Sequence, residues 1–140
     1  MKKPILFLLS IVFVLLISAC SGLSTTKVTG KYFLVAMDGD KSNTSLSYEV
    51  GDDEDAFEGV IEPIVGAVGV DSNFIIAKQY ATLDPKKESE RFYYYIVVMA
   101  ERTERGDKNG VYGPFNENDF LIKKKQLGVP ANLDFTIFVK

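Results

Sequence analysis

The residues able to do chemistry in this chain are few, and the missing types restrict its function more than those present. The 140-residue sequence contains no histidine and a single cysteine, Cys20. Catalysis by a serine or cysteine that histidine activates is therefore excluded, as are zinc sites built from cysteine and histidine. We expect no cofactor and no enzyme. The alternative is a hydrolase that works with carboxylates, or with lysine and serine alone.

One segment carries oxygen-bearing side chains at the spacing of a calcium site. Positions 1, 3, 5 and 12 of an EF-hand loop correspond here to Asp38, Asp40, Ser42 and Glu49. Such a loop needs glycine at its sixth position, where this chain has Asn43, and it joins two helices rather than two strand-like segments. We interpret the segment as a hairpin turn and keep the four residues as metal candidates.

A run of four acidic residues follows this segment and consists of Asp52, Asp53, Glu54 and Asp55. Carboxylate oxygens are suitable ligands for a hard cation, and the run would also suit a basic protein partner. The same density of charge is typical of an ordinary solvated loop. We therefore treat the run as a candidate binding surface without assigning a ligand to it.

Three consecutive tyrosines form a second candidate surface. Side chains alternate across a strand, so Tyr93 and Tyr95 should share one face and Tyr94 should lie on the other. Together with Tyr80 and Tyr112, these tyrosines would form an aromatic platform for a glycan or a protein. The alternative is that these tyrosines are core residues whose hydroxyl groups reach the rim.

The first twenty residues have the pattern of a bacterial lipoprotein signal. Lys2 and Lys3 precede an uncharged apolar stretch, and Ile17-Ser18-Ala19-Cys20 resembles the lipobox at which the leader is removed and lipid is attached to the cysteine. The apolar stretch is shorter than the roughly 20 residues that span a bilayer. We expect a signal peptide over residues 1–19, a lipidated Cys20 with a flexible tether over 20–30, and one globular domain over 31–140.

This leader predicts where the protein is located, and its removal gives the net charge that bears on possible partners. The resemblance implies a lipid anchor in the bacterial cell envelope, at the outer membrane where one exists and otherwise on the outer face of the cell membrane. Loss of Lys2 and Lys3 leaves fourteen basic residues against nineteen acidic ones, a net charge of −5. This charge argues against nucleic acid as a partner. We expect the membrane, through the lipid, and a protein or cell-wall partner.

Beyond the leader, aromatic and β-branched segments predict about six strands. Val60–Val70 and Phe74–Tyr80 are separated by Asp71-Ser72-Asn73, which indicates a β-hairpin. Phe92–Ala100 is apolar on both faces and should be a central strand, covered above and below. The remaining strands are expected over residues 32–37, 44–50 and 133–139.

One helix is expected near the C-terminus. Asn116 is a suitable N-cap, and Gly128 stands where a helix ends in a left-handed residue. Phe120 and Leu121 should lie on the buried side of this helix. Because the loops are short, strands should pair antiparallel. The prediction is an α+β domain with a mainly antiparallel sheet of about six strands and the helix packed on one face. A β-sandwich is the alternative.

Three motifs resemble a family of small bacterial lipoproteins that is known as a domain of unknown function. They are Val68-Gly69-Val70-Asp71-Ser72-Asn73-Phe74-Ile75-Ile76-Ala77-Lys78, the tyrosine-rich Phe92–Ile96, and Gly113-Pro114-Phe115 before the helix. The family pattern is a Val-Gly-x-Asp-x-x-Phe-Ile-x-Ala-Lys hairpin and a Gly-Pro-Leu/Phe turn, and the resemblance covers residues 30–139. It implies no activity, but it draws attention to Asp71, Lys78, Gly113 and Pro114.

These observations lead to two functional hypotheses. The first is a membrane-anchored envelope lipoprotein whose domain binds a protein or a wall component without catalysing a reaction. The alternative is an immunity or inhibitor lipoprotein that neutralises a secreted toxin or enzyme, for which a basic partner is expected because the mature chain is acidic.

Overall fold

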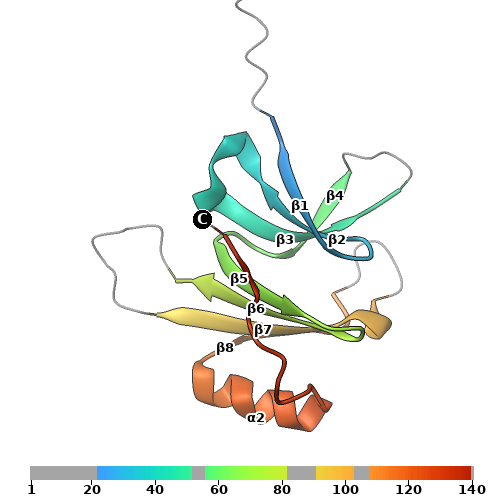
Figure 1. Ribbon diagram of the computed structural model, residues 1–140, viewed down its shortest axis with the longest axis vertical. Coiled ribbons are helices and arrows are strands. Elements are labelled where there is room, and N and C mark those ends of the chain that lie inside the picture. The colour runs from blue at the N-terminus through green and yellow to red at the C-terminus, as the bar shows by residue number, and fades with distance from the viewer. Residues whose placement is uncertain (1–21, 52–55, 82–90, 103–107, 140) are drawn as a thin grey trace, which may run out of the picture.

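The computed structural model describes residues 22–51, 56–81, 91–102 and 108–139. Figure 1 shows its three layers, which are two β-sheets and one helix. The strands are β1 (Ser24–Thr29), β2 (Tyr32–Ala36), β3 (Thr44–Glu49), β4 (Phe57–Ile61), β5 (Val65–Val70), β6 (Phe74–Tyr80), β7 (Phe92–Val98), β8 (Val111–Phe115) and β9 (Ile137–Phe138). The helices are the 3-10 turns η2 (Met37–Gly39), η3 (Lys41–Asn43) and η5 (Met99–Glu101), and the α-helix α2 (Glu117–Leu127).

Both sheets are antiparallel. The first has the order β1-β2-β3-β4, and the second has the order β8-β7-β6-β5-β9. The inner faces of the two sheets pack against each other, and α2 packs on the outer face of the second sheet against β7 and β8. The predicted α+β class and the helix on one face are confirmed. The strands are distributed over two sheets that pack as a sandwich.

The number of strands is higher than the predicted six because three segments, residues 24–29, 60–70 and 111–115, behave differently from their sequence pattern. The expected strand over residues 60–70 is divided at Pro63, where the chain crosses from β4 in the first sheet to β5 in the second. Proline cannot donate to a sheet ladder, which favours a crossing at this point. Residues 111–115 form an edge strand on β7 despite Gly113 and Pro114.

The structure also differs from the predicted tether and from the predicted last strand. Ser24–Thr29 was expected to be flexible, but it pairs with β2 along its whole length as β1. Three threonines and Val28 favour this extended backbone. At the C-terminal end, the described strand consists of Ile137 and Phe138, which pair with β5. Leu133 and Phe135 instead pack into the cluster under α2.

Two apolar clusters hold the layers together. The cluster between the sheets contains Tyr32, Leu34, Leu46, Ile61, Val65, Val68, Ile75, Ala77 and Val97. The cluster between the second sheet and α2 contains Ile76, Tyr94, Ile96, Phe120, Val129 and Leu133. Alternate residues of β6 and β7 therefore belong to different clusters. The strand predicted over residues 92–100 is therefore central and covered on both faces, as expected, but it ends at Val98, and Met99–Glu101 form η5 instead.

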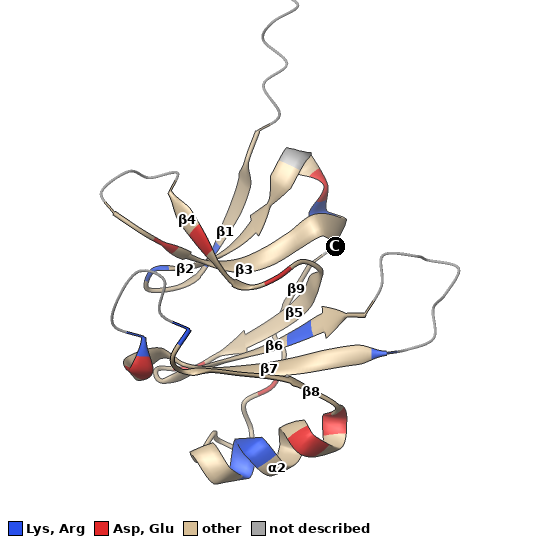
Figure 2. Ribbon diagram, turned by 180° about the vertical axis from the view of Figure 1, so that it is seen from behind, with Lys and Arg blue, Asp and Glu red and all other residues tan. Residues whose placement is uncertain are grey.

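Helix α2 begins and ends where the sequence predicts. The Asn116 side chain accepts a hydrogen bond from the Asp119 backbone N–H at 2.9 Å, and Gly128 has a φ of +72° at the C-terminal end. Acidic residues occupy the first turn and lysines the last, as Figure 2 shows, which suits the helix dipole. Phe120 is buried as expected, but Leu121 is 55% exposed. No helix among the described residues is long and apolar enough to cross a membrane.

Candidate functional site

Among the described metal candidates, the structure brings Asp40 and Ser42 together and places Glu49 apart from them. The Asp40 carboxylate caps η3 by accepting hydrogen bonds from the Ser42 backbone N–H at 2.9 Å and the Ser42 hydroxyl at 2.6 Å. These hydrogen bonds lower the pKa of Asp40, and the one from the Ser42 hydroxyl has the larger effect. Glu49 ends β3, so the length of that strand, about 16 Å, separates it from the turn. The side chain of Asp38 lies outside the described part. Within the described ranges, no group of three or more acidic or cysteine side chains could hold a metal ion.

Two other predictions fall outside the part of the chain that the structure describes. They concern the lipidation site Cys20 and the acidic run Asp52, Asp53, Glu54 and Asp55. The described neighbours of the acidic run are Gly51, which follows β3, and Ala56, which precedes β4. The run therefore connects two paired strands of the first sheet.

The predicted tyrosine platform is divided between the two faces of the second sheet. Tyr95 contacts the cluster between the sheets, whereas Tyr94 and Tyr112 belong to the cluster under α2. The Tyr95 hydroxyl donates to Gln79 Oε1 at 2.9 Å, and Gln79 Nε2 donates to the carbonyl oxygens of Glu62 and Pro63 at 2.8 and 3.0 Å. Tyr95 therefore braces the crossing between the sheets.

Tyr93 and Tyr112, which also belong to the predicted platform, have different surroundings. Tyr93 is exposed at the same face as Tyr95. On the opposite face, the Tyr112 hydroxyl donates to Glu101 Oε2 at 2.9 Å, and Lys123 Nζ lies 4.9 Å from the centre of its ring. The hydrogen bond to Glu101 is the main reason that the pKa of Tyr112 is raised. Tyr93, Tyr95 and Tyr112 cannot contact one ligand together.

A different aromatic surface lies on the α2 side of the second sheet, and we define it by Lys78, Tyr80, Phe92 and Phe138. Lys78 Nζ lies 3.7 Å from the centre of the Phe92 ring and 5.9 Å from that of Tyr94. The Tyr80 and Phe92 rings are 5.2 Å apart. Tyr80 is 49% exposed and Phe138 is 62% exposed. The aromatic surface is therefore the part of this face that α2 and the segment after it leave open.

The backbone explains how these four residues come to share a face. Lys78 and Tyr80 alternate on β6, and Tyr80 is paired with Phe92. Phe138 is paired with Ala67, which is paired in turn with Lys78. Gly66 forms a bulge between them, and a side chain there would overlap the Tyr80 ring. The absence of a Cβ at Gly66 thus lets Tyr80 lie against β5.

The other motif residues have structural roles. Asp71 Oδ1 accepts hydrogen bonds from the backbone N–H groups of Asn73 and Phe74, both at 2.8 Å, and closes the predicted hairpin. Gly69 gives room to the Asp134 carbonyl, which crosses over β5. Gly113 has a φ of +133° against the Tyr94 carbonyl. Lys78 differs from these residues because its described contacts are with aromatic rings.

An ion pair joins the two sheets at the side of β4. Arg102, which follows η5, places Nη2 3.1 Å from Glu58 Oε2 on β4, and its guanidinium carbon lies 4.8 Å from the centre of the Tyr48 ring. The side chains of Arg102 and Glu58 are 2% and 29% exposed. The burial of Arg102 indicates a structural role rather than a ligand site.

The fold and these surfaces define a small two-sheet domain of the α+β class with an open aromatic surface on its second sheet. The chain belongs to the family described as "Protein of unknown function (DUF3997)", which matches residues 29–138. This match confirms the predicted membership in a family of unknown function. No curated protein and no solved structure matches the chain.

Sequence reasoning identified Tyr80 and Lys78 separately but did not combine them with Phe92 and Phe138. The alternation of Lys78 and Tyr80 was a usable signal, because residues two apart on a strand share a face. Phe138 carried no such signal. Its neighbourhood depends on β9 pairing with β5, about 70 residues earlier in the chain.

Proposed function

We propose that this protein is a bacterial envelope lipoprotein, anchored through lipid on Cys20, and that its domain binds an envelope partner without catalysing a reaction. The leader supports the anchor, because its charge pattern and lipobox match those of lipoprotein signals. The residue types support a binding role, because the chain has no histidine and its one cysteine would carry the lipid.

The observation that carries the binding role is the aromatic surface. Tyr80 and Phe138 expose large apolar area beside a lysine that rests on Phe92. Among the described residues, Lys78 makes no ion pair with a carboxylate. Aromatic side chains are enriched in protein interfaces, and tyrosine is among the residues that supply most of the binding energy there. The aromatic surface therefore suits a partner that offers an apolar group next to an acidic one.

The direction of the chain supports an aromatic surface that faces away from the proposed anchor. Figure 1 shows that β1 begins at the end of the molecule opposite α2. Ser24, the first residue of β1, is four residues after Cys20, a separation of at most about 14 Å along an extended chain. The first sheet would thus lie nearest the membrane, and the aromatic surface would be turned toward the envelope partner.

The anchor is tested by feeding producing cells an alkyne-tagged fatty acid and detecting its incorporation into the protein. We expect labelling of the natural chain and none of Cys20→Ala. The substituted chain should also be released from the membrane fraction. Labelling that persists in Cys20→Ala would contradict the anchor at this residue.

The binding role is tested by photo-crosslinking in living cells. A photoreactive amino acid is placed at Tyr80 or Phe138 in the full chain, and at Thr25 on β1 as an exposed control. We expect one shared crosslinked product from positions 80 and 138, reduced by Lys78→Gln and missing from position 25. A product obtained equally from all three positions, or from none, would contradict a partner on this surface. A basic secreted toxin or enzyme in the product would assign the inhibitory function.

A further inference from the structure

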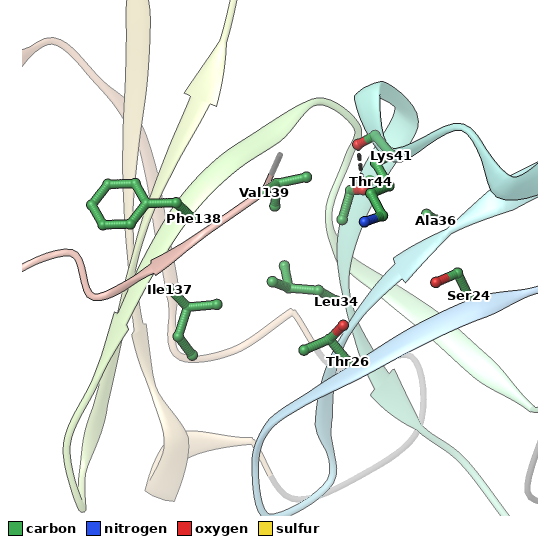
Figure 3. Close-up of a pocket in the computed structure, with 9 residues that line it drawn as sticks. All are labelled: Ser24, Thr26, Leu34, Ala36, Lys41, Thr44, Ile137, Phe138 and Val139. Carbon is green, nitrogen blue, oxygen red and sulfur yellow. Dashed lines mark hydrogen bonds between the residues drawn. The ribbon is translucent and has the colours of Figure 1, made fainter.

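A cleft lies at the side of the sandwich where both sheets end. β1 is the edge strand of the first sheet and β9 is the edge strand of the second. β1 has six residues and β9 has two, so the second sheet does not cover the whole inner face of β1. Figure 3 shows the resulting space between the two edges.

The lining of this edge cleft is apolar at its floor and polar at its mouth. The cleft measures about 230 Å³, and its lining side chains are Ser24, Thr26, Leu34, Ala36, Lys41, Thr44, Ile137 and Val139. The Phe138 ring points away from it (Figure 3). Leu34 and Ala36 are buried in the first sheet, and Ile137 and Val139 face them from the C-terminal segment. The hydroxyl groups of Ser24 and Thr26 are directed toward the space (Figure 3).

Lys41 is the charged side chain in this lining. The turn η3 holds its backbone, because the Thr44 hydroxyl donates to the Lys41 carbonyl at 2.6 Å. Its ammonium group is turned toward Leu34 and Val139 in Figure 3. The neighbouring Asp40 carboxylate is engaged by Ser42, and no described carboxylate forms an ion pair with Lys41. The edge cleft therefore offers one cation and two hydroxyl groups above an apolar floor.

We propose that the edge cleft binds the carboxylate end of a long-chain fatty acid. The carboxylate would pair with Lys41 Nζ at the end of the cleft near η3, where Figure 3 shows the ammonium group turned toward Leu34 and Val139. The first methylene groups would lie on Leu34 and Ile137, where they lose contact with water. Sites for whole drug-sized ligands have volumes of about 300–1,000 Å³, so this smaller cleft holds the head end and leaves the rest of the chain outside.

The position of the cleft supports this ligand. Ser24 is both the first residue of β1 and part of the lining. On the anchor proposed above, the mouth of the cleft then lies close to the membrane, where free fatty acids are concentrated. This supporting step rests on the proposed function, whereas the chemistry of the lining does not.

The test uses the full chain in phosphatidylcholine vesicles with a diazirine-bearing palmitic acid as the photoreactive probe. We expect mass spectrometry to map labelling to the segments that contain Leu34 and Ile137. The methyl ester of the same probe should label about tenfold less, because it lacks the charge that Lys41 binds. Lys41→Gln should reduce labelling by the acid to the level of the ester. Lys31→Gln, at an exposed position in the turn before β2, is the matched control and should leave labelling unchanged.

Equal labelling by acid and ester, or full labelling of Lys41→Gln, would overturn the fatty acid site. Circular dichroism of each variant shows whether its fold is retained. Labelling of Cys20→Ala in the same vesicles separates this proposal from the anchor, because a cleft that works without the lipid would still be labelled. Crosslinking from Tyr80 separates it from the aromatic surface, since Lys41→Gln should leave that product intact.

Discussion

Tyr32 on β2 has a side chain poorly matched to its surroundings. It is 4% exposed, and its hydroxyl oxygen has no hydrogen-bond partner within the described structure. Burial raises the pKa of Tyr32, the nearby Arg102 guanidinium acts in the opposite direction, and Tyr48 adds a smaller upward effect. The neutral hydroxyl is therefore tolerated in the core, and the charged form is disfavoured.

Replacing Tyr32 by phenylalanine tests this assignment. At neutral pH the substitution should leave the free energy of unfolding unchanged or raise it by about 1 kcal/mol, because an unpaired buried hydroxyl is removed. The raised pKa stabilises the folded protein fully below the ordinary tyrosine value of about 10, and this contribution is lost as the pH rises through the folded-state value. Tyr32→Phe should thus lose less stability than the natural chain above pH 10.

Urea unfolding at a series of pH values measures this difference. Tyr93→Phe, at an exposed position on β7, serves as the control and should follow the natural chain. A Tyr32→Phe protein that is less stable at neutral pH by more than about 1 kcal/mol would show that the hydroxyl has a partner.

At the scale of elements, alanine substitutions at two glycines of β5 should destabilise the domain to different extents. A side chain at Gly69 would overlap the Asp134 carbonyl, which is backbone and cannot turn aside. A side chain at Gly66 would overlap the ring of Tyr80, which is half exposed and can rotate away. Gly69→Ala should destabilise the domain by about 2 kcal/mol or more, and Gly66→Ala by less than about 1 kcal/mol.

The two substitutions should also separate stability from binding. Gly66→Ala should displace Tyr80 and weaken the crosslinked product obtained from Phe138, although the domain stays folded. Thermal unfolding and the yield of that product are the two measurements. A Gly66→Ala protein with both normal stability and normal yield would show that Tyr80 does not contact the partner.

The N-cap of α2 allows a matched comparison within one helix. The Asn116 side chain accepts from the Asp119 N–H, whereas Asn118, two residues on, is exposed in the first turn. Asn116→Ala should lower the free energy of unfolding by about 1 kcal/mol. Asn118→Ala should change it little, because alanine is a better helix former than asparagine. Equal effects in chemical unfolding would contradict the capping role.

The elements that the sequence predicted well are those fixed by local signals. The cap at Asn116, the end at Gly128 and the Asp71 turn each depend on residues within a few positions of one another. The central position of β7 was also predictable, because a strand that is apolar on both faces must be covered twice.

The parts that escaped prediction depend on contacts between distant segments. β1 resembles a polar linker, and only its pairing with β2 makes it a strand. The division of residues 60–70 between the sheets and the short β9 likewise follow from long-range packing. The alternation of Tyr94 and Tyr95 was predicted correctly, but the aromatic surface required the position of Phe138. Local periodicity identifies the face of a strand but not its neighbours.

At the scale of the whole molecule, the two sides of the sandwich differ. At the side of β1 and β9 the sheets leave the edge cleft open. At the side of β4, Arg102 reaches from the segment after β7 to Glu58 and covers the Tyr48 ring. One side is thus held together by a charged contact between the sheets, while the other side remains accessible.

This asymmetry leads to a prediction about Arg102. Arg102→Met keeps much of the apolar stem but removes the guanidinium that pairs with Glu58 and stacks on Tyr48. Removal of one member of a buried pair leaves the other member without a partner and shielded from water. Because Glu58 is part-exposed, this cost is reduced, and we expect the free energy of unfolding to fall by about 2–3 kcal/mol. Glu58→Gln should cost less, because the amide oxygen can still accept from the guanidinium and the stacking on Tyr48 remains. Urea unfolding of both variants and of the double variant gives the coupling between the two residues.

If the contact closes this side of the sandwich, hydrogen exchange in Arg102→Met should rise first in β4 and η5, while exchange in α2 stays slow. A uniform rise across both sheets and α2 would instead show that Arg102 stabilises the whole fold without holding this side.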